Sequence, residues 1–199
     1  MATTNQSDVL IIGGGLAGLV TAYECLLAGK RVSLVDRDNR ERLGGLALWA
    51  FGGMALVDTP LQRRMKIKDS AEIALRDWIR FGELSEADIL PRQWAEYYVQ
   101  HSRTQVYDWL IGHGLKFLPA VNWVERGMQG NGNSLPRYHI LWGTSRQLIR
   151  RMIELVLSAG ENGRFTLLSH HRVTNIEYSA GVLSGAVAIN ESNKAEVHL

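Results

Sequence analysis

The distribution of apolar residues predicts a strand, a helix and a second strand at the start of the chain. Val9–Ile12 is a short apolar run, which is typical of a buried strand in a parallel sheet. Residues 16–28 carry apolar side chains at helical spacing, and Gly29 stands where a left-handed residue commonly ends a helix. A second strand is predicted at Val32–Val35, and Asp36 ends it. This order indicates a βαβ unit at the start of an α/β domain.

The loop between the first strand and the helix has glycines at the spacing G-x-G-x-x-G. Gly13 permits a tight turn out of the strand, and Gly15 has no side chain to keep a pyrophosphate from the backbone. Gly18 allows the helix to pack closely against the sheet. Unpaired N–H groups at the start of the helix also attract phosphate. The predicted phosphate contacts of a dinucleotide are therefore Gly13, Gly15, Leu16, Ala17 and Gly18.

Asp36 is placed to recognise the ribose of that dinucleotide. A carboxylate at the end of the second strand can accept hydrogen bonds from ribose hydroxyls, and it disfavours the 2′-phosphate of NADP. We include the next residue, Arg37, in the predicted site. The motif alone does not separate NAD from FAD, and the alternative without a ligand is a tight glycine turn.

Two glycine pairs after the second strand favour FAD over NAD. Gly44-Gly45 and Gly52-Gly53 are separated by small and aromatic residues, among them Ala47. Such a backbone can run close beside a large flat ligand, whereas an ordinary NAD domain begins another helix soon after this strand. An NAD-binding dehydrogenase stays as the less favoured alternative.

Three segments resemble the fumarate reductase and succinate dehydrogenase flavoprotein superfamily, which includes ketosteroid dehydrogenases. Residues 43–53 resemble its flavin-contacting loop. Residues 133–144, with Arg137 and His139, look like its Arg-x-His loop, and Val173 lies in a segment similar to the strand that contacts adenine. The chain is similar over nearly its whole length to the branch called FAD-binding dehydrogenases.

The resemblance implies an FAD-dependent oxidoreductase, a dehydrogenase or reductase that transfers hydride at the flavin. Leu46 stands where members with covalent flavin carry a His, so FAD binding is expected to be non-covalent. Arg137 is expected to offer a cation to a small-molecule substrate, and His139 to donate a hydrogen bond or a proton. Steroid, enoate and dicarboxylate substrates all stay open. In the alternative interpretation, both side chains only brace their loop.

The remaining pattern predicts helices in the middle of the chain and strands near its end. The fold class is α/β: a Rossmann-like FAD-binding domain with a parallel sheet, a helical insertion and a small antiparallel β meander. We predict one domain over residues 1–199, with a dinucleotide-binding part at 1–58, the insertion at 59–143, and a helix with the meander at 144–199. The expected elements are helices over 71–82, 91–112 and 144–159, strands over 115–118, 165–168, 172–178 and 182–189, and a final strand from 195.

Composition excludes several other classes of protein. Hydrophobic residues make up 46% and charged residues 21% of the chain, as in folded globular proteins. The net charge of +2 gives no basic footprint for nucleic acid, and no apolar run approaches the ~20 residues of a membrane span. Cys25 is the single cysteine, which fits a reducing compartment, so we expect a cytoplasmic location. No His/Cys cluster has metal-binding spacing, so we expect no metal.

The last predicted strands form an antiparallel excursion rather than a return to the parallel sheet. We therefore expect a missing C-terminal region or oligomerisation, with apolar surface left exposed. The alternative to a functional flavoprotein is a truncated, non-catalytic FAD-binding fragment that needs a missing domain or a partner.

Overall fold

The computed structural model describes residues 7–127 and 132–199, and these form two compact units. Of these residues, 7–50 and 145–199 belong to unit 1, and 51–127 and 132–144 belong to unit 2. The predicted insertion at 59–143 lies within unit 2. The grouping of all residues into a single domain stays a prediction.

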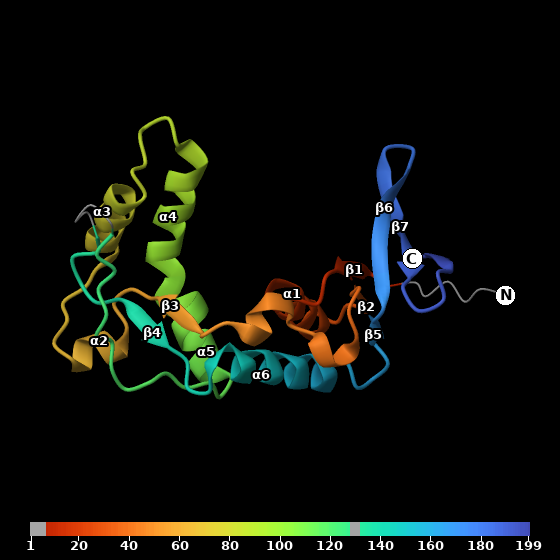
Figure 1. The fold of residues 1–199 in the computed structure, drawn as a ribbon, viewed down its shortest axis with the longest axis horizontal. Coiled ribbons are helices and arrows are strands. Elements are labelled where there is room, and N and C mark those ends of the chain that lie inside the picture. Colours follow the sequence, from red (N-terminus) through yellow and green to blue (C-terminus); the bar gives the residue numbers. More distant parts are fainter. Residues whose placement is uncertain (1–6, 128–131) are drawn as a thin grey trace. The chain divides into compact units, whose positions relative to one another are not determined.

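Unit 1 is built on a parallel three-stranded sheet. The strands β1 (Val9–Ile12), β2 (Val32–Val35) and β5 (Phe165–Leu168) lie in the order β1-β2-β5. Helix α1 (Leu16–Leu27) connects β1 to β2, as Figure 1 shows. Strand β2 is the central strand of this sheet, and all four of its residues are buried. The predicted Rossmann-like βαβ unit is confirmed.

A long helix and a meander complete unit 1. Helix α6 (Thr144–Ala159) coincides with the predicted helix and buries Leu148, Ile149, Met152 and Val156 along one face. The meander consists of β6 (His171–Ser179), β7 (Val182–Asn190) and β8 (Glu196–His198), all antiparallel. Two short 3-10 helices, Arg40–Arg42 and Gly45–Trp49, follow β2.

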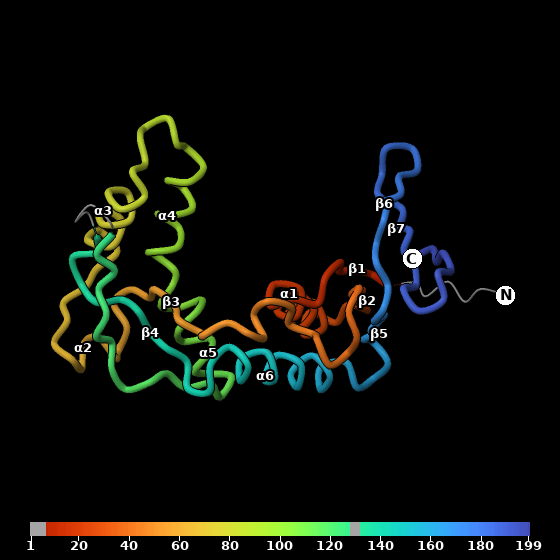
Figure 2. Tube along the Cα trace, in the orientation of Figure 1, coloured from red at the N-terminus to blue at the C-terminus, as the bar shows by residue number. Residues whose placement is uncertain are grey.

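Unit 2 is mostly helical, and its chain path can be followed in Figure 2. A two-stranded antiparallel sheet pairs β3 (Gly53–Ala55) with β4 (Tyr138–Ile140), and Val57, Ala74 and Val99 form a small buried core. The helices are α2 (Pro60–Arg64), α3 (Ala71–Phe81), α4 (Ile89–His101), a π-helix (Ser102–Asp108) and α5 (Trp109–Gly112).

Two sequence predictions in unit 2 are wrong. Residues 115–118 do not form a strand: Phe117 makes a single antiparallel bridge to Leu141. Pro119 explains this, because it has no N–H with which to continue a ladder. Conversely, the predicted loop at 133–144 contains β4, which the short β3 holds in register.

Neither a membrane span nor a metal site emerges from the described residues. Among the helices at 7–127 and 132–199, none has the length and apolarity needed to cross a bilayer. The same residues contain no group of three His, Cys, Asp or Glu side chains arranged to hold a metal ion.

Candidate functional site

The glycine loop joins β1 directly to the start of α1. Gly13 adopts φ +100°, a conformation that favours glycine, and its N–H donates to the Val35 carbonyl at 2.8 Å. The helix begins at Leu16, and no side chain caps it. Because the first N–H groups of a helix have no acceptor within the helix, this end of α1 offers donors to an anion.

Two of the motif glycines, Gly15 and Gly18, differ in the space around them. A Cβ atom added at Gly15 would meet no neighbouring heavy atom within 4 Å, so this part of the backbone faces open space. A Cβ atom at Gly18 would lie 2.0 Å from the Gly13 carbonyl oxygen. Gly18 is therefore required for packing, while Gly15 leaves room for a ligand beside the helix start.

The Asp36 carboxylate points at the same loop. Its Oδ2 accepts the Gly14 N–H at 2.6 Å, and its Oδ1 accepts the Asp38 N–H at 2.8 Å. An ionised carboxylate has about four acceptor positions, so acceptor capacity remains for ribose hydroxyls. The adjacent Arg37 is exposed.

The second glycine segment lies beside the first. Gly44 donates its N–H to the Gly14 carbonyl at 2.7 Å and forms a parallel bridge with Gly15. Gly44 has φ +103°, and a Cβ atom there would lie 2.5 Å from the Ile149 side chain on α6. Gly45, in contrast, has open space around it. Ala47 follows in the same 3-10 helix, half-buried.

Strand β6 begins beside Asp36. The N–H of His171, the first residue of β6, donates to the Asp36 carbonyl at 2.9 Å. Val173 follows two residues later, half-buried and paired with Ala188. The structure of unit 1 thus brings together the residues predicted to bind the nucleotide at 13–18, 36–37, 44–47 and 173.

Gly52 and Gly53 belong to unit 2, where packing accounts for the second of them. Gly52 has φ +82°, and its carbonyl accepts the Leu141 N–H at 3.0 Å. A Cβ atom at Gly53 would lie 1.9 Å from the Tyr138 ring. Contact of this pair with a cofactor stays a prediction.

Arg137 is buried in an ion-pair network within unit 2. Its side chain is 3% exposed and forms two hydrogen bonds of 2.8 Å with Asp69 and one of 2.7 Å with Asp77. Burial alone would lower the pKa of Arg137, but its hydrogen bonds to Asp69 and Asp77 raise that pKa overall. Asp77 also accepts from Ser134 and Arg80. The guanidinium is therefore firmly charged, and each of its nitrogens donates to a buried carboxylate.

His139 is completely buried, and both ring nitrogens have partners. Nδ1 lies 2.6 Å from the Arg137 carbonyl oxygen, and Nε2 lies 2.7 Å from the Thr59 hydroxyl. Burial lowers the pKa of His139, which keeps the ring neutral. Since a carbonyl only accepts, Nδ1 donates and Nε2 accepts the Thr59 proton. The ring edges also pack against Tyr107 and Phe117.

These contacts favour the interpretation in which Arg137 and His139 brace their loop. A catalytic role for either side chain stays a prediction. Sequence reasoning missed their partners Thr59, Asp69 and Asp77. One signal was available: Asp77 occupies the same helix face as Ala74, and a charged residue on a buried face normally has a partner.

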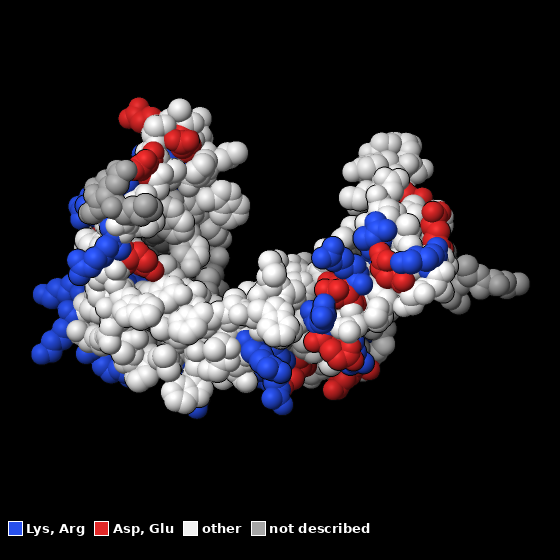
Figure 3. All heavy atoms as spheres, in the orientation of Figure 1, with Lys and Arg blue, Asp and Glu red and all other residues white. Residues whose placement is uncertain are grey.

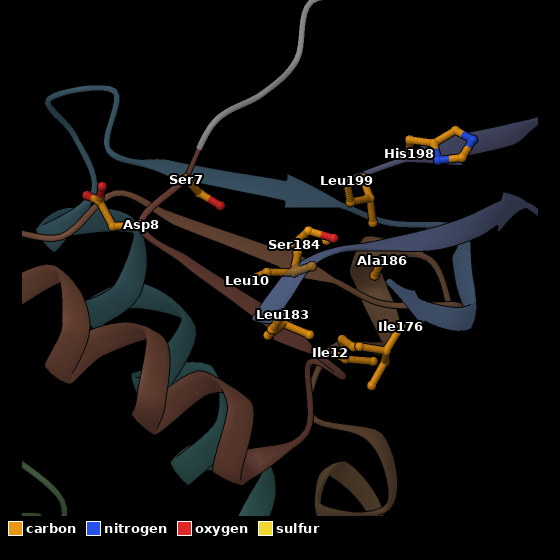
Figure 4. A pocket seen from close by; sticks show the side chains of 11 residues that line it. Ser7, Asp8, Leu10, Ile12, Ile176, Leu183, Ser184, Ala186, His198 and Leu199 are labelled. Carbon is orange, nitrogen blue, oxygen red and sulfur yellow. The ribbon is translucent and has the colours of Figure 1, made fainter. Parts of the chain in front are cut away.

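An apolar cleft of about 470 Å³ lies elsewhere in unit 1, between β1 and the meander. Figure 4 shows Leu10 and Ile12 of β1 facing Leu183 and Ile176 across it. Ile12 is 52% exposed and Leu183 is 63% exposed. Large apolar side chains are thus left open to solvent on unit 1, as predicted.

Comparison with known proteins gives one family and a consistent set of relatives. Residues 8–199 match the FAD binding domain family. A KsdD-like steroid dehydrogenase from Mycolicibacterium smegmatis is 39% identical over 184 residues, covering 90% of this chain and 33% of that protein. A KsdD-like steroid dehydrogenase from Mycobacterium tuberculosis is 46% identical over 147 residues, covering 72% and 26%. The chain therefore spans about a third or less of the length of these curated relatives.

Solved structures show the same fold at lower identity. The 3-ketosteroid-Δ4-(5α)-dehydrogenase from Rhodococcus jostii RHA1, in complex with 4-androstene-3,17-dione, superposes with a TM-score of 0.75 at 20% identity. The match covers 98% of this chain and 45% of that one. A flavocytochrome c3 fumarate reductase in its open conformation gives 0.72 at 22% identity, covering 96% and 32%.

Proposed function

The chain belongs to the FAD binding domain family, and from this premise we propose that it forms the nucleotide-binding part of an FAD-dependent oxidoreductase that transfers hydride. The resemblance read from the glycine segments is confirmed, and FAD is the dinucleotide. The NAD alternative is thereby set aside. The protein's own reaction, substrate and partners are proposals, since the chain matches only part of each relative.

One observation carries this proposal: the open backbone at Gly15 lies beside the uncapped start of α1 and the Asp36 carboxylate. These groups fit the ADP part of FAD. We propose that the N–H groups at the start of α1 hold the pyrophosphate and that Asp36 accepts from the ribose. Gly45, which has open space around it, would let the cofactor pass close to the backbone.

When bound, FAD supplies the hydride chemistry, and the chain supplies binding and orientation. The tight Gly14–Asp36 and Gly14–Gly44 hydrogen bonds fix the loop before the ligand arrives. A preformed loop lowers the entropy lost on binding. Leu46 is 90% exposed and has no nucleophilic group, which supports non-covalent attachment.

We propose a steroid-type substrate for the protein that carries this chain. The KsdD-like relatives support a steroid over an enoate or a dicarboxylate. The charge of the Arg137 guanidinium is already balanced by two buried carboxylates, which would repel a dicarboxylate. A dye-reduction assay of that protein with 4-androstene-3,17-dione and with succinate tests this: reduction by succinate alone would overturn it.

We also propose that further polypeptide, from a longer chain or a second copy, covers the apolar cleft beside β1. The exposed Ile12 and Leu183 support this, as does the greater length of the relatives. Gel filtration of residues 1–199 should then show self-association. A strictly monomeric chain at high concentration would contradict the part of the proposal that concerns a second copy.

Flavin retention provides the direct test of the nucleotide site. Residues 1–199 would be incubated with FAD, desalted and precipitated with acid, and the released flavin quantified. Gly15→Val should abolish retention, because a branched side chain would occupy the space left for the pyrophosphate. Gly112→Val is the matched control, since Gly112 also has open space around it but lies in unit 2. Undiminished flavin in Gly15→Val would refute the placement of the site.

A further inference from the structure

The turn between α6 and β5 in unit 1 contains an Asn-Gly pair at the surface. Residues 160–164 join the end of α6 to the start of β5, and Asn162 and Gly163 are both exposed. Figure 3 shows basic and acidic side chains interspersed on the visible surface around the end of α6, which is typical of a region in contact with water. Water therefore reaches both residues of the pair.

The fold does not hold the Asn162 side chain in place. Among the described residues at 7–127 and 132–199, none is a hydrogen-bond partner of its amide group. The Asn190 side chain, in contrast, accepts the Ser192 N–H at 2.9 Å. The Asn193 side chain accepts the Ala195 N–H, also at 2.9 Å. The Asn162 amide can therefore rotate to bring its carbonyl carbon against the next backbone nitrogen.

Gly163 leaves that backbone nitrogen accessible. It has φ +73°, and a Cβ atom added there would meet no heavy atom within 4 Å. Its N–H has one acceptor, the Gly160 carbonyl at 3.1 Å. A single hydrogen bond in an exposed turn opens at little cost in free energy, so the Gly163 nitrogen becomes available for reaction.

We infer that Asn162 is a site of spontaneous deamidation, with the Gly163 nitrogen as the nucleophile. This nitrogen loses its proton to base in the solvent and forms a bond to the Asn162 Cγ atom. The Cγ–Nδ2 bond breaks, and ammonia leaves. Water then opens the cyclic imide at either carbonyl carbon, which gives aspartate or isoaspartate. Nothing is oxidised or reduced, and the reaction is independent of FAD.

The contacts of Arg164 make this turn sensitive to the modification. Its carbonyl accepts the Val32 N–H on β2 at 2.7 Å, and its guanidinium donates to the Leu26 carbonyl on α1 at 3.1 Å. The end of the turn is thus fixed to two other elements of unit 1. Isoaspartate adds a methylene to the main chain of the turn, whereas aspartate adds only a negative charge. We expect isoaspartate to be the more damaging product.

Peptide mapping by mass spectrometry tests the inference on residues 1–199 aged at pH 8, because it reports each asparagine separately. Asn162 should deamidate at least about tenfold faster than Asn193, since less free energy is needed to reach the cyclic transition state. Asn193 is the matched control: it is exposed and is followed by Lys194 at φ +62°, but its side chain is hydrogen-bonded. Equal rates at the two positions would overturn the inference.

Gly163→Ala tests the role of the nucleophile. The added methyl group should slow deamidation of Asn162 about tenfold by crowding the attacking nitrogen. Ala180 shows that alanine is accepted at positive φ in another turn of this chain, and circular dichroism confirms that the variant is folded. An unaltered rate in folded Gly163→Ala would overturn the inference. A product at Asn162 that contains aspartate but no isoaspartate would overturn the cyclic route.

Thermal unfolding measures the consequence for unit 1. The aged chain should melt about 2–4 °C below Asn162→Asp, which carries the charge without the additional main-chain atom. Asn162→Gln aged in parallel corrects for modification at other positions. Equal melting temperatures of the corrected aged chain and Asn162→Asp would overturn the effect assigned to isoaspartate.

Discussion

The glycine loop of unit 1 and the Arg137–His139 segment of unit 2 contain the residues that the sequence marks most clearly. The two regions differ in whether their polar groups have hydrogen-bond partners. At the loop, the start of α1 is uncapped and Gly15 faces open space. In unit 2, each nitrogen of Arg137 and of His139 has a partner. Unmet hydrogen-bonding capacity beside open space indicates a ligand site, whereas complete pairing under burial indicates a structural one.

The largest expected effect is on the free energy of unfolding, and it tests whether Arg137 has a structural role. Arg137→Met should lower the free energy of unfolding by about 3–5 kcal/mol, because it leaves Asp69 and Asp77 buried without their cation. Urea unfolding followed by circular dichroism measures the loss. Unchanged stability together with lost catalytic turnover would instead assign Arg137 to the reaction.

Two neighbouring glycines separate packing from binding at the loop. Gly18→Ala should destabilise the chain by about 1–3 kcal/mol, since the new Cβ atom would collide with the Gly13 carbonyl. Gly15→Ala meets no such obstacle and should change stability little while lowering FAD affinity. Thermal unfolding and flavin titration of both variants check this. The reverse assignment of effects would contradict the roles given to the two glycines.

The neutral, buried His139 should make stability depend on pH. Burial lowers its pKa in the folded state below the ordinary value of 6.5, so the unfolded chain binds the proton more readily. Stability is therefore full above pH 6.5 and falls as the pH drops below it, by at most about 1.4 kcal/mol per pH unit. Urea unfolding between pH 7.5 and 5 measures this slope. His139→Asn should reduce it, and an unaltered slope would point to another group.

Arg37 gives the smallest expected effect. Its side chain is exposed, and the nucleotide contacts expected in this segment come from Asp36 and the backbone. Arg37→Ala should therefore change FAD affinity by less than about threefold, the scale of a single exposed contact. Flavin fluorescence titration measures the change. A tenfold loss would show that the Arg37 side chain itself binds the cofactor.

Local patterns predicted the βαβ unit, the long helices and the meander because each depends on neighbouring residues. The strand at Val9–Ile12, the left-handed Gly29 and the stripe on α6 all have such local causes. Caps are equally local: the Ser70 side chain accepts the Ile73 N–H at the start of α3, and Thr59 and Gln62 form a full capping box on α2.

The pairs that define the Arg137 network could not be predicted in this way. Asp69 and Asp77 lie 68 and 60 residues from Arg137 in the chain, so no local spacing relates them. The strand β4 was missed for the same reason, since it depends on a partner far away at β3. The nucleotide site was easier to predict because most of its residues follow one another within a single βαβ unit.

The π-helix at Ser102–Asp108 has a consequence for how this part of the chain tolerates insertions and deletions. Its wider turn sets the angular position of Tyr107, which stacks on Phe117 with ring planes 8° apart. Removing one residue here would narrow the turn and change the angular position of Tyr107 on the helix. Tyr107 would then turn away from Phe117, so the length of this segment is as tightly specified as its composition.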